Sequence, residues 1–445
     1  MSSKKLPRLA VAAWLIAIMA ASCGREEQKP LQEYVTSSAS VAAIVDLKDI
    51  FRQAGMPLGH PQPMLEGIQE DILSLSTFSI MTNALSQLVA TRAIDGEVLL
   101  VTLDDRSEVA VVTVVDEDAL RRVTDDEMYK AVVTRRGSLC FLAADKEISE
   151  RVISEAEQEA SASLVSVREH LAGKGDMRVA MHSAATDFAA TRAEWALSTV
   201  SVSAEAISSE TILLDNDGRQ QPFGCVFAEI DPAVAGFIPP EAIVAGAFGA
   251  PSREIKGLDK ALLSYAGISA SEITGTSAFS LALAGSVDNI RTAGPDAFNI
   301  QFLTAATPEF GDSLVDRLAD RFGGAAYVAG QYVSGTPGDG GIFLCATDGY
   351  FVESLNRPVS SGYNNDFASA FEGKRAALAV EIPYGSSAMK NLGLPAGISL
   401  RIALTADRLK ARLRFNHSDN PAILTLLELN KDLAAWLAEA PALLL

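Results

Sequence analysis

The sequence predicts an α+β fold of two tandem, similar domains, each a mainly antiparallel sheet covered by helices on one face. Runs rich in β-branched residues, such as 96–103 and 109–115, follow each other in pairs. Helical segments separate these pairs without strict alternation of strand and helix, which favours antiparallel sheets. Several segments also recur in the same order about 200 positions later, which indicates an internal duplication.

Length and charge narrow the functional classes. A chain of 445 residues has room for two or three domains with adequate cores. Its net charge of −19 argues against nucleic-acid binding, because phosphate contacts need clustered lysine and arginine.

The first 22 residues have the pattern of a signal peptide. A short basic region with Lys4, Lys5 and Arg8 precedes an uncharged apolar run over 9–21. This run is too short to cross a bilayer as a helix, which takes about 20 residues.

The run ends in Ala20-Ala21-Ser22-Cys23, which resembles the lipobox of bacterial lipoproteins, with Ala20 where that family most often has leucine. The resemblance implies that Cys23 is lipidated and becomes the first residue of the mature chain. It also implies an outer-membrane location, since Gly24 is not the aspartate that retains enteric lipoproteins at the inner membrane. An ordinary secretory signal and an uncleaved anchor are the alternatives.

Composition then divides the chain into segments. The predicted units are a signal peptide (1–22), a lipidated cysteine with a polar tether (23–37), a first α+β repeat (38–215), a linker with the first strand of the second half (216–239), a second repeat (240–420) and an amphipathic helix (421–445). Because its leucines and Trp436 share one face, we expect this last helix to dock on the second repeat, with partner binding as the alternative.

The first half reads as a series of strands and capped helices. Asp116 or Asp118 can cap a helix over 118–123, and Asp145 can cap one over 148–158. Further strands are predicted at 130–134 and 139–143 in the first half, and at 278–284, 299–305, 326–333 and 341–345 in the second. Helices 64–75 and 258–263 are expected to cover one face of each sheet.

The duplication makes a structural prediction. Matching pairs are Ser40–Ala43 with Ala242–Ala245, Gly137–Val152 with Gly340–Leu355, Met177–Met181 with Ala376–Val380, and Val202–Asn216 with Ile402–Asn416. Each pair should occupy the same place in its half. Two unrelated α+β domains are the alternative.

The chemistry-bearing residues form no catalytic motif. His60, His170, His182 and His417 lie outside any HExxH pattern, and GxSxG and Walker A sequences are absent. Asp215-Asn216-Asp217-Gly218 begins like a calcium loop, but it lacks the acidic residue expected near position 226. We therefore predict no catalytic, cofactor or metal residues, and no enzyme.

Three cysteines remain beside Cys23. Cys140 and Cys345 are expected in corresponding strands and on the same face, as buried free thiols rather than a bridge. Whether Cys225 pairs is left open by the sequence.

These patterns predict a membrane-anchored envelope lipoprotein that acts as a non-enzymatic binding or interaction module. The chain resembles uncharacterised bacterial lipoproteins whose halves open with a strand like Val41–Leu47. That resemblance implies architecture and no active site. Expected partners are the membrane, through the anchor, and an envelope protein, with no nucleic acid. The alternative is a periplasmic carrier of an apolar ligand such as lipid, and a hydrolase using scattered Asp and Ser has no motif behind it.

Overall fold

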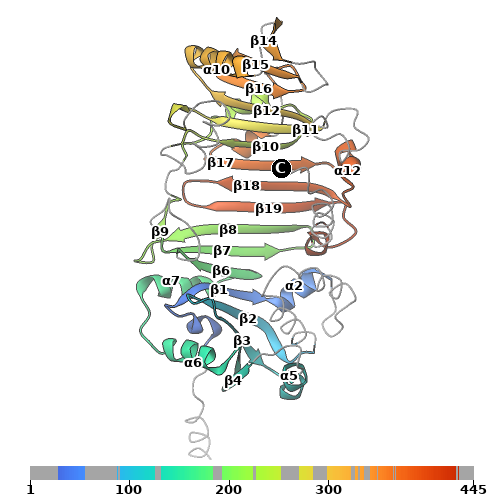
Figure 1. Ribbon diagram of the computed structural model, residues 1–445. Coiled ribbons are helices and arrows are strands. Elements are labelled where there is room, and N and C mark those ends of the chain that lie inside the picture. Colours follow the sequence, from blue (N-terminus) through green and yellow to red (C-terminus); the bar gives the residue numbers. More distant parts are fainter. Residues whose placement is uncertain are drawn as a thin grey trace, which may run out of the picture.

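One antiparallel sheet runs through the whole molecule (Figure 1). The computed structural model describes residues 29–55, 88, 91–125, 132–183, 193–223, 227–251, 270–283, 298–321, 326–328, 331–334, 341–347, 349–363, 365, 367–426 and 429. Nineteen strands within these ranges belong to the sheet. The expectation of an α+β protein built on antiparallel strands is confirmed.

The first half contributes nine strands with helices on either side. Its elements are η1 (Leu31–Tyr34), β1 (Ala39–Asp46), α2 (Leu47–Gln53), β2 (Ile94–Leu103), β3 (Glu108–Val114), α5 (Glu117–Thr124), β4 (Val132–Arg136), β5 (Leu139–Ala143), α6 (Lys146–Glu155), α7 (Ala162–Leu171), β6 (Met177–His182), β7 (Trp195–Val202), β8 (Ala206–Leu214) and β9 (Gln220–Gln221).

The second half contributes ten strands. Its elements are η2 (Pro232–Phe237), β10 (Ala242–Phe248), η3 (Ala270–Glu272), β11 (Ser277–Leu283), β12 (Phe298–Ala305), α10 (Pro308–Arg321), β13 (Ala326–Val328), β14 (Gln331–Ser334), β15 (Ile342–Thr347), β16 (Tyr350–Leu355), α11 (Phe367–Phe371), β17 (Ala376–Ile382), α12 (Ser387–Leu392), β18 (Gly397–Leu404) and β19 (Leu409–Asn416).

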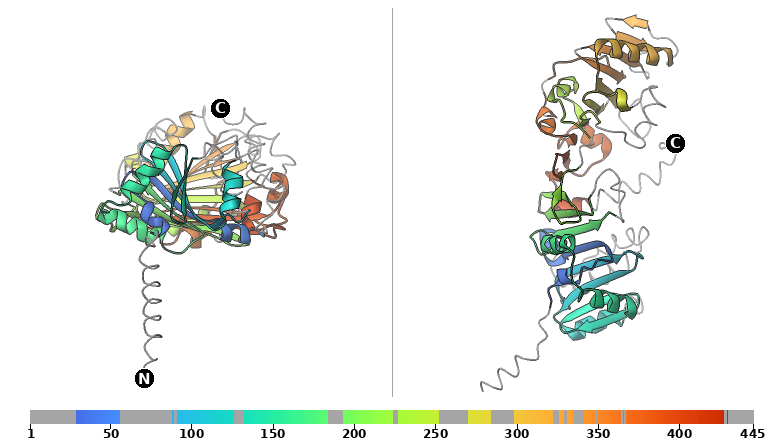
Figure 2. Two further views of the ribbon diagram at one scale, coloured as in Figure 1. Left: turned by 90° about the horizontal axis from the view of Figure 1, so that it is seen from below. Right: turned by 90° about the vertical axis from the view of Figure 1, so that its left-hand side faces the viewer.

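Hydrogen-bonded neighbours follow one order in both halves. The first half runs β4-β5-β3-β2-β1-β6-β7-β8, and the second runs β15-β16-β12-β11-β10-β17-β18-β19. Strands β8 and β19 pair with each other and join the two runs. The sequence predicted a separate sheet for each domain, but this pairing makes them one elongated layer (Figure 2).

Helices lie on both faces of the sheet, so the prediction of helices on one face is wrong. Strand β5 is buried along its whole length. Its Phe141 packs with side chains of α6 and α7, whereas Cys140 and Leu142 pack with side chains of α5 on the opposite side. A strand covered on both sides reads as a continuous apolar run, and LCFLA is such a run. We call the two sides the α7 face and the α5 face.

The structure confirms helix caps that the sequence predicts in the first half. Asp116 caps α5 by accepting hydrogen bonds from the amides of Asp118 and Ala119, both at 3.0 Å. Asp145 caps α6 through the amide of Ile148 at 2.9 Å. Predicted helices 64–75 and 258–263 lie outside the described residues.

The polar tether predicted at 23–37 ends earlier in the structure. Leu31, Tyr34 and Val35 are buried in the core on the α7 face, and Tyr34 meets the ring of Phe141 edge-on at 5.0 Å. Arg168 fixes this segment by donating to the Val35 carbonyl at 2.8 and 3.1 Å. Leucine and aromatic residues next to a polar stretch therefore belong to the folded body.

The other boundaries also differ from the predicted ones. The segment 216–239 holds the two-residue strand β9 and the helix η2, and the first long strand of the second half is β10. The C-terminal segment begins as a helix at 422–426, where Ala422 joins a cluster with Phe415 and Ile207 on the α5 face. Trp436 lies outside the described residues.

Two of the matched segment pairs differ from the structure. Ser40–Ala43 and Ala242–Ala245 are one residue out of register, because Ala42 packs on the α7 face and its match Val244 packs on the α5 face. Gly137–Val152 forms β5 and the start of α6, whereas Gly340–Leu355 contains the hairpin of β15 and β16. By strand order β5 corresponds to β16, so Cys140 and Cys345 are not in corresponding strands. They also lie on opposite faces, since Cys140 packs on the α5 side and Cys345 on the α7 side.

Candidate binding face

The middle of the sheet carries an exposed polar surface on the α7 face. Helix α7 packs on β6 and β7, and α11 packs on β17 and β18 on the same face. Between these two helices lie the α7-face side chains of β7, β8, β19 and β18. This surface, the central strip, consists of Thr199, Ser201, Ser208, Glu210, Lys410, Arg412, Arg414, Ser399 and Arg401, together with Arg408, which precedes β19 and pairs with Glu210.

The strip contains a row of hydroxyl and guanidinium groups that crosses four strands. Ser201 lies opposite Ser208, Ser208 opposite Arg412, and Arg412 opposite Arg401. Residues directly opposite in antiparallel strands point to the same side, so the four side chains share the α7 face. Ser201, Arg401 and Arg412 are exposed.

Ion pairs hold most of the charges of the strip. Glu210 accepts from Arg408 at 2.6 Å and lies 3.2 Å from the Nζ of Lys410. Arg401 pairs with Glu381 at 2.9 Å, while Arg412 has no ion-pair partner among the described residues. The strip is therefore a cationic surface with unused donors on an acidic protein.

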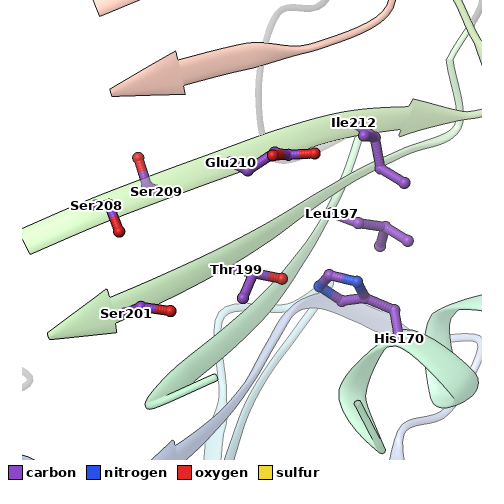
Figure 3. Close-up of a pocket in the computed structure, with 8 residues that line it drawn as sticks. All are labelled: His170, Leu197, Thr199, Ser201, Ser208, Ser209, Glu210 and Ile212. Carbon is purple, nitrogen blue, oxygen red and sulfur yellow. The ribbon is translucent and has the colours of Figure 1, made fainter. Parts of the chain in front are cut away.

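A hollow of about 410 Å³ lies where the strip meets α7 (Figure 3). Two apolar side chains, Leu197 and Ile212, lie closest to α7, and polar groups line the rest. The full lining is His170, Leu197, Thr199, Ser201, Ser208, Ser209, Glu210 and Ile212.

His170 reaches the hollow from the last turn of α7. Its Nε2 lies 3.1 Å from the carbonyl oxygen of Ser198, and since a carbonyl can only accept, Nε2 carries the proton. Burial lowers the pKa of His170 below its usual value. The imidazole is therefore neutral near pH 7 and acts as a hydrogen-bonding group rather than a cation.

The residues singled out by the sequence do not converge on a catalytic centre. His182, on β6, lies 3.8 Å from Glu194 and edge-on to Trp195, whereas His417 follows β19, from which β7 and β8 separate β6. Within the described ranges no three potential ligands gather to hold a metal ion. Cys23, His60 and Cys225 lie outside those ranges.

The candidate calcium loop is a self-contained turn. Asp215 accepts hydrogen bonds from the amides of Asp217 and Arg219, at 3.0 and 2.8 Å. These bonds, the one from Arg219 first, lower the pKa of Asp215. Backbone donors thus satisfy the carboxylate that a calcium ion would need.

Of the two described cysteines Cys140 is buried, as predicted, whereas Cys345 is only partly buried. Cys140 and Cys345 form no disulfide, and burial raises the pKa of Cys140 to about 11. A thiol with such a pKa is inert near pH 7.

Sequence reasoning missed the central strip, although β19 carries a signal for it. Lys410, Arg412 and Arg414 alternate with apolar residues, which places three cations on one side of a strand. On the other side Leu413 and Phe415 pack against the start of the C-terminal segment.

No helix in the described part of the chain is long and apolar enough to cross a membrane. No model of a known protein family matches the sequence, and no curated protein matches it either.

Proposed function

We propose that the protein is a membrane-anchored envelope lipoprotein whose body is a non-enzymatic binding module, and that the central strip is its binding surface. The anchor would be lipidated Cys23, after removal of residues 1–22. The observation that carries the proposal is the strip itself: exposed cations and hydroxyls between two helices, on a sheet whose flanks are covered.

We also propose that the two halves arose by duplication. Strands β1 and β10 each carry an irregularity at the same point of their pairing, at Val41 and at Val244. Paired residues can be followed from one strand to the next. From Val41 on β1 they lead through β6 and β7 to Leu213 on β8, and from Val244 on β10 they lead through β17 and β18 to Leu413 on β19. Leu213 and Leu413 are then equivalent positions.

This equivalence makes the join between the halves symmetric. Glu210 precedes Leu213 by three residues, as Lys410 precedes Leu413, and these two residues face each other across the join. An antiparallel pair in which equivalent positions meet has a local two-fold axis through that pair. The binding surface would therefore be composite, with β7 and β8 from one unit and β18 and β19 from the other.

The carrier of an apolar ligand has less support. Such a site is a cavity lined mainly by apolar side chains. The hollow beside α7 has a suitable volume, but six of its eight lining residues are polar or charged.

Photo-crosslinking in intact cells tests the binding surface. A photoreactive residue in place of Ser208 should give discrete crosslinked products, and one in place of exposed Glu147 on α6 should not. Equal products from both positions, or none from Ser208, would overturn the assignment of the strip.

A separate experiment tests the anchor. Cys23→Ser should leave an unprocessed precursor or release the protein from the membrane fraction. Membrane fractionation of the variant at mature size would contradict lipidation at Cys23.

A further inference from the structure

We propose that the central strip binds one acidic α-helix of a partner protein, which lies between α7 and α11. This inference rests on the proposed function, because it identifies the kind of partner that the strip accepts.

The width of the strip matches a single helix. Helix α7 lies over β6 and β7, and α11 lies over β17 and β18. Four strand spacings separate the two helix positions, or about 19 Å. Packed helices are about 8–10 Å apart, so one further helix can contact both neighbours.

The charges of the strip favour carboxylates that come at intervals. Lys410, Arg412 and Arg414 are spaced along one strand, and Arg401 lies beside Arg412. A helix with glutamates at i, i+4 and i+7 presents carboxylates at comparable intervals along one side. Arginine is also the cation best suited to paired contacts with a carboxylate.

Carboxylates within the strip disfavour a continuous polyanion. Glu210, Glu381, Glu205 and Asp407 all lie among its cations as ion-pair partners. A phosphate polymer would meet these groups as well as the cations, whereas a helix can place its acidic residues at the cations alone.

The hollow offers a place for one side chain of the helix. Leu197, which is 2% exposed, lines it with an apolar side chain, while Thr199 and His170 line it with hydrogen-bonding groups. Pockets of this kind hold the residues that contribute most to an interface.

Binding of model peptides to the purified protein tests the inference. The probe is an alanine-based helix of about 18 residues, which matches the length of β8 and β19. It carries glutamate along one side, and a matched peptide carries lysine instead. Fluorescence anisotropy should show binding of the glutamate peptide, weakened by salt, and no binding of the lysine peptide.

Variants then locate the binding. The pair Arg401→Ala and Arg412→Ala should weaken binding about tenfold. The control Arg121→Ala removes an exposed arginine of α5 and should change nothing. The inference is overturned if the glutamate peptide does not bind, or if the double variant binds it unchanged.

Crosslinking separates this inference from the proposed function. Products from position 208 that map to an acidic helix support both. Products that map to a lipid, a polysaccharide or a basic segment would overturn the helix and keep the binding surface. An absence of products would overturn the binding surface itself.

Discussion

The charge pair at the join of β8 and β19 measures how strongly the two halves depend on each other. Glu210 and Lys410 face each other in the sheet, with side chains 40% and 54% exposed. Glu210→Lys would replace this attraction by two ammonium groups on opposite positions, beside Arg408. Lys410→Glu leaves Arg408 to neutralise Glu210, so its effect should be smaller.

Exposure limits the size of the effect. A pair this exposed contributes about 0.5–1 kcal/mol. Like charges directly opposite in a sheet destabilise by a similar amount. Glu210→Lys should therefore lower the stability of the join by about 1–2 kcal/mol. The variant with both substitutions, Glu210→Lys and Lys410→Glu, restores an opposite-charge pair and should recover most of the lost stability.

Amide hydrogen exchange of β8 and β19 is the assay, because it reports local opening free energies at the join. The control is a variant in which Lys146 and Glu150, an i, i+4 ion pair on α6, are each replaced by the other residue. It should leave the exchange rates of the β8 and β19 amides unchanged. If the variant with both substitutions is as unstable as the sum of the two single variants, the side chains do not interact and the expected charge coupling across the join is wrong.

Three further predictions concern single sites. Burial lowers the pKa of His170 below 6.5, so the unfolded chain binds a proton at this residue more readily than the folded protein does. The free energy of unfolding should therefore fall as the pH drops through 6.5. In urea titrations His170→Gln should flatten this pH dependence, and an unchanged dependence would contradict the prediction. Gly246→Ala places a methyl group 2.4 Å from the Phe279 ring and should lower the free energy of unfolding in urea by about 1–3 kcal/mol. Adding Phe279→Leu should restore much of this loss, and an unchanged loss would contradict the clash. Arg168→Met should speed proteolysis at Val35, and equal rates would show that other contacts hold the segment.

Local structure was predictable where local chemistry determines it. Asp145, and Asp116 or Asp118, were predicted as caps because a carboxylate before an amphipathic run satisfies free helical amides, and the structure selects Asp116. The strand at 139–143 was also predicted, and it is an unbroken apolar run that is buried along its whole length. The same run shows that both faces are covered, and the prediction of helices on one face overlooked it.

Relations between distant strands were not predictable from spacing alone. The match of Gly137–Val152 with Gly340–Leu355 relied on similar residue types. In the order of strands along the sheet, β5 instead corresponds to β16. Short apolar strands resemble one another because each fits the same buried pleat. Order along the sheet is set by hydrogen bonds between segments far apart in sequence, which no local pattern records.

The central strip combines both situations. Alternation in β19 shows that Lys410, Arg412 and Arg414 share one side of a strand, and this part was available in the sequence. Their neighbours Ser208 and Glu210 come from a strand 200 positions earlier, and the pairing of β8 with β19 brings them together. Among the described residues, the helices α7 and α11 on this face end over β7 and β18, while the start of the C-terminal segment packs on the opposite face at Phe415. A surface formed where two similar units meet lies in neither unit alone, so a search for motifs within each half had no means of finding it.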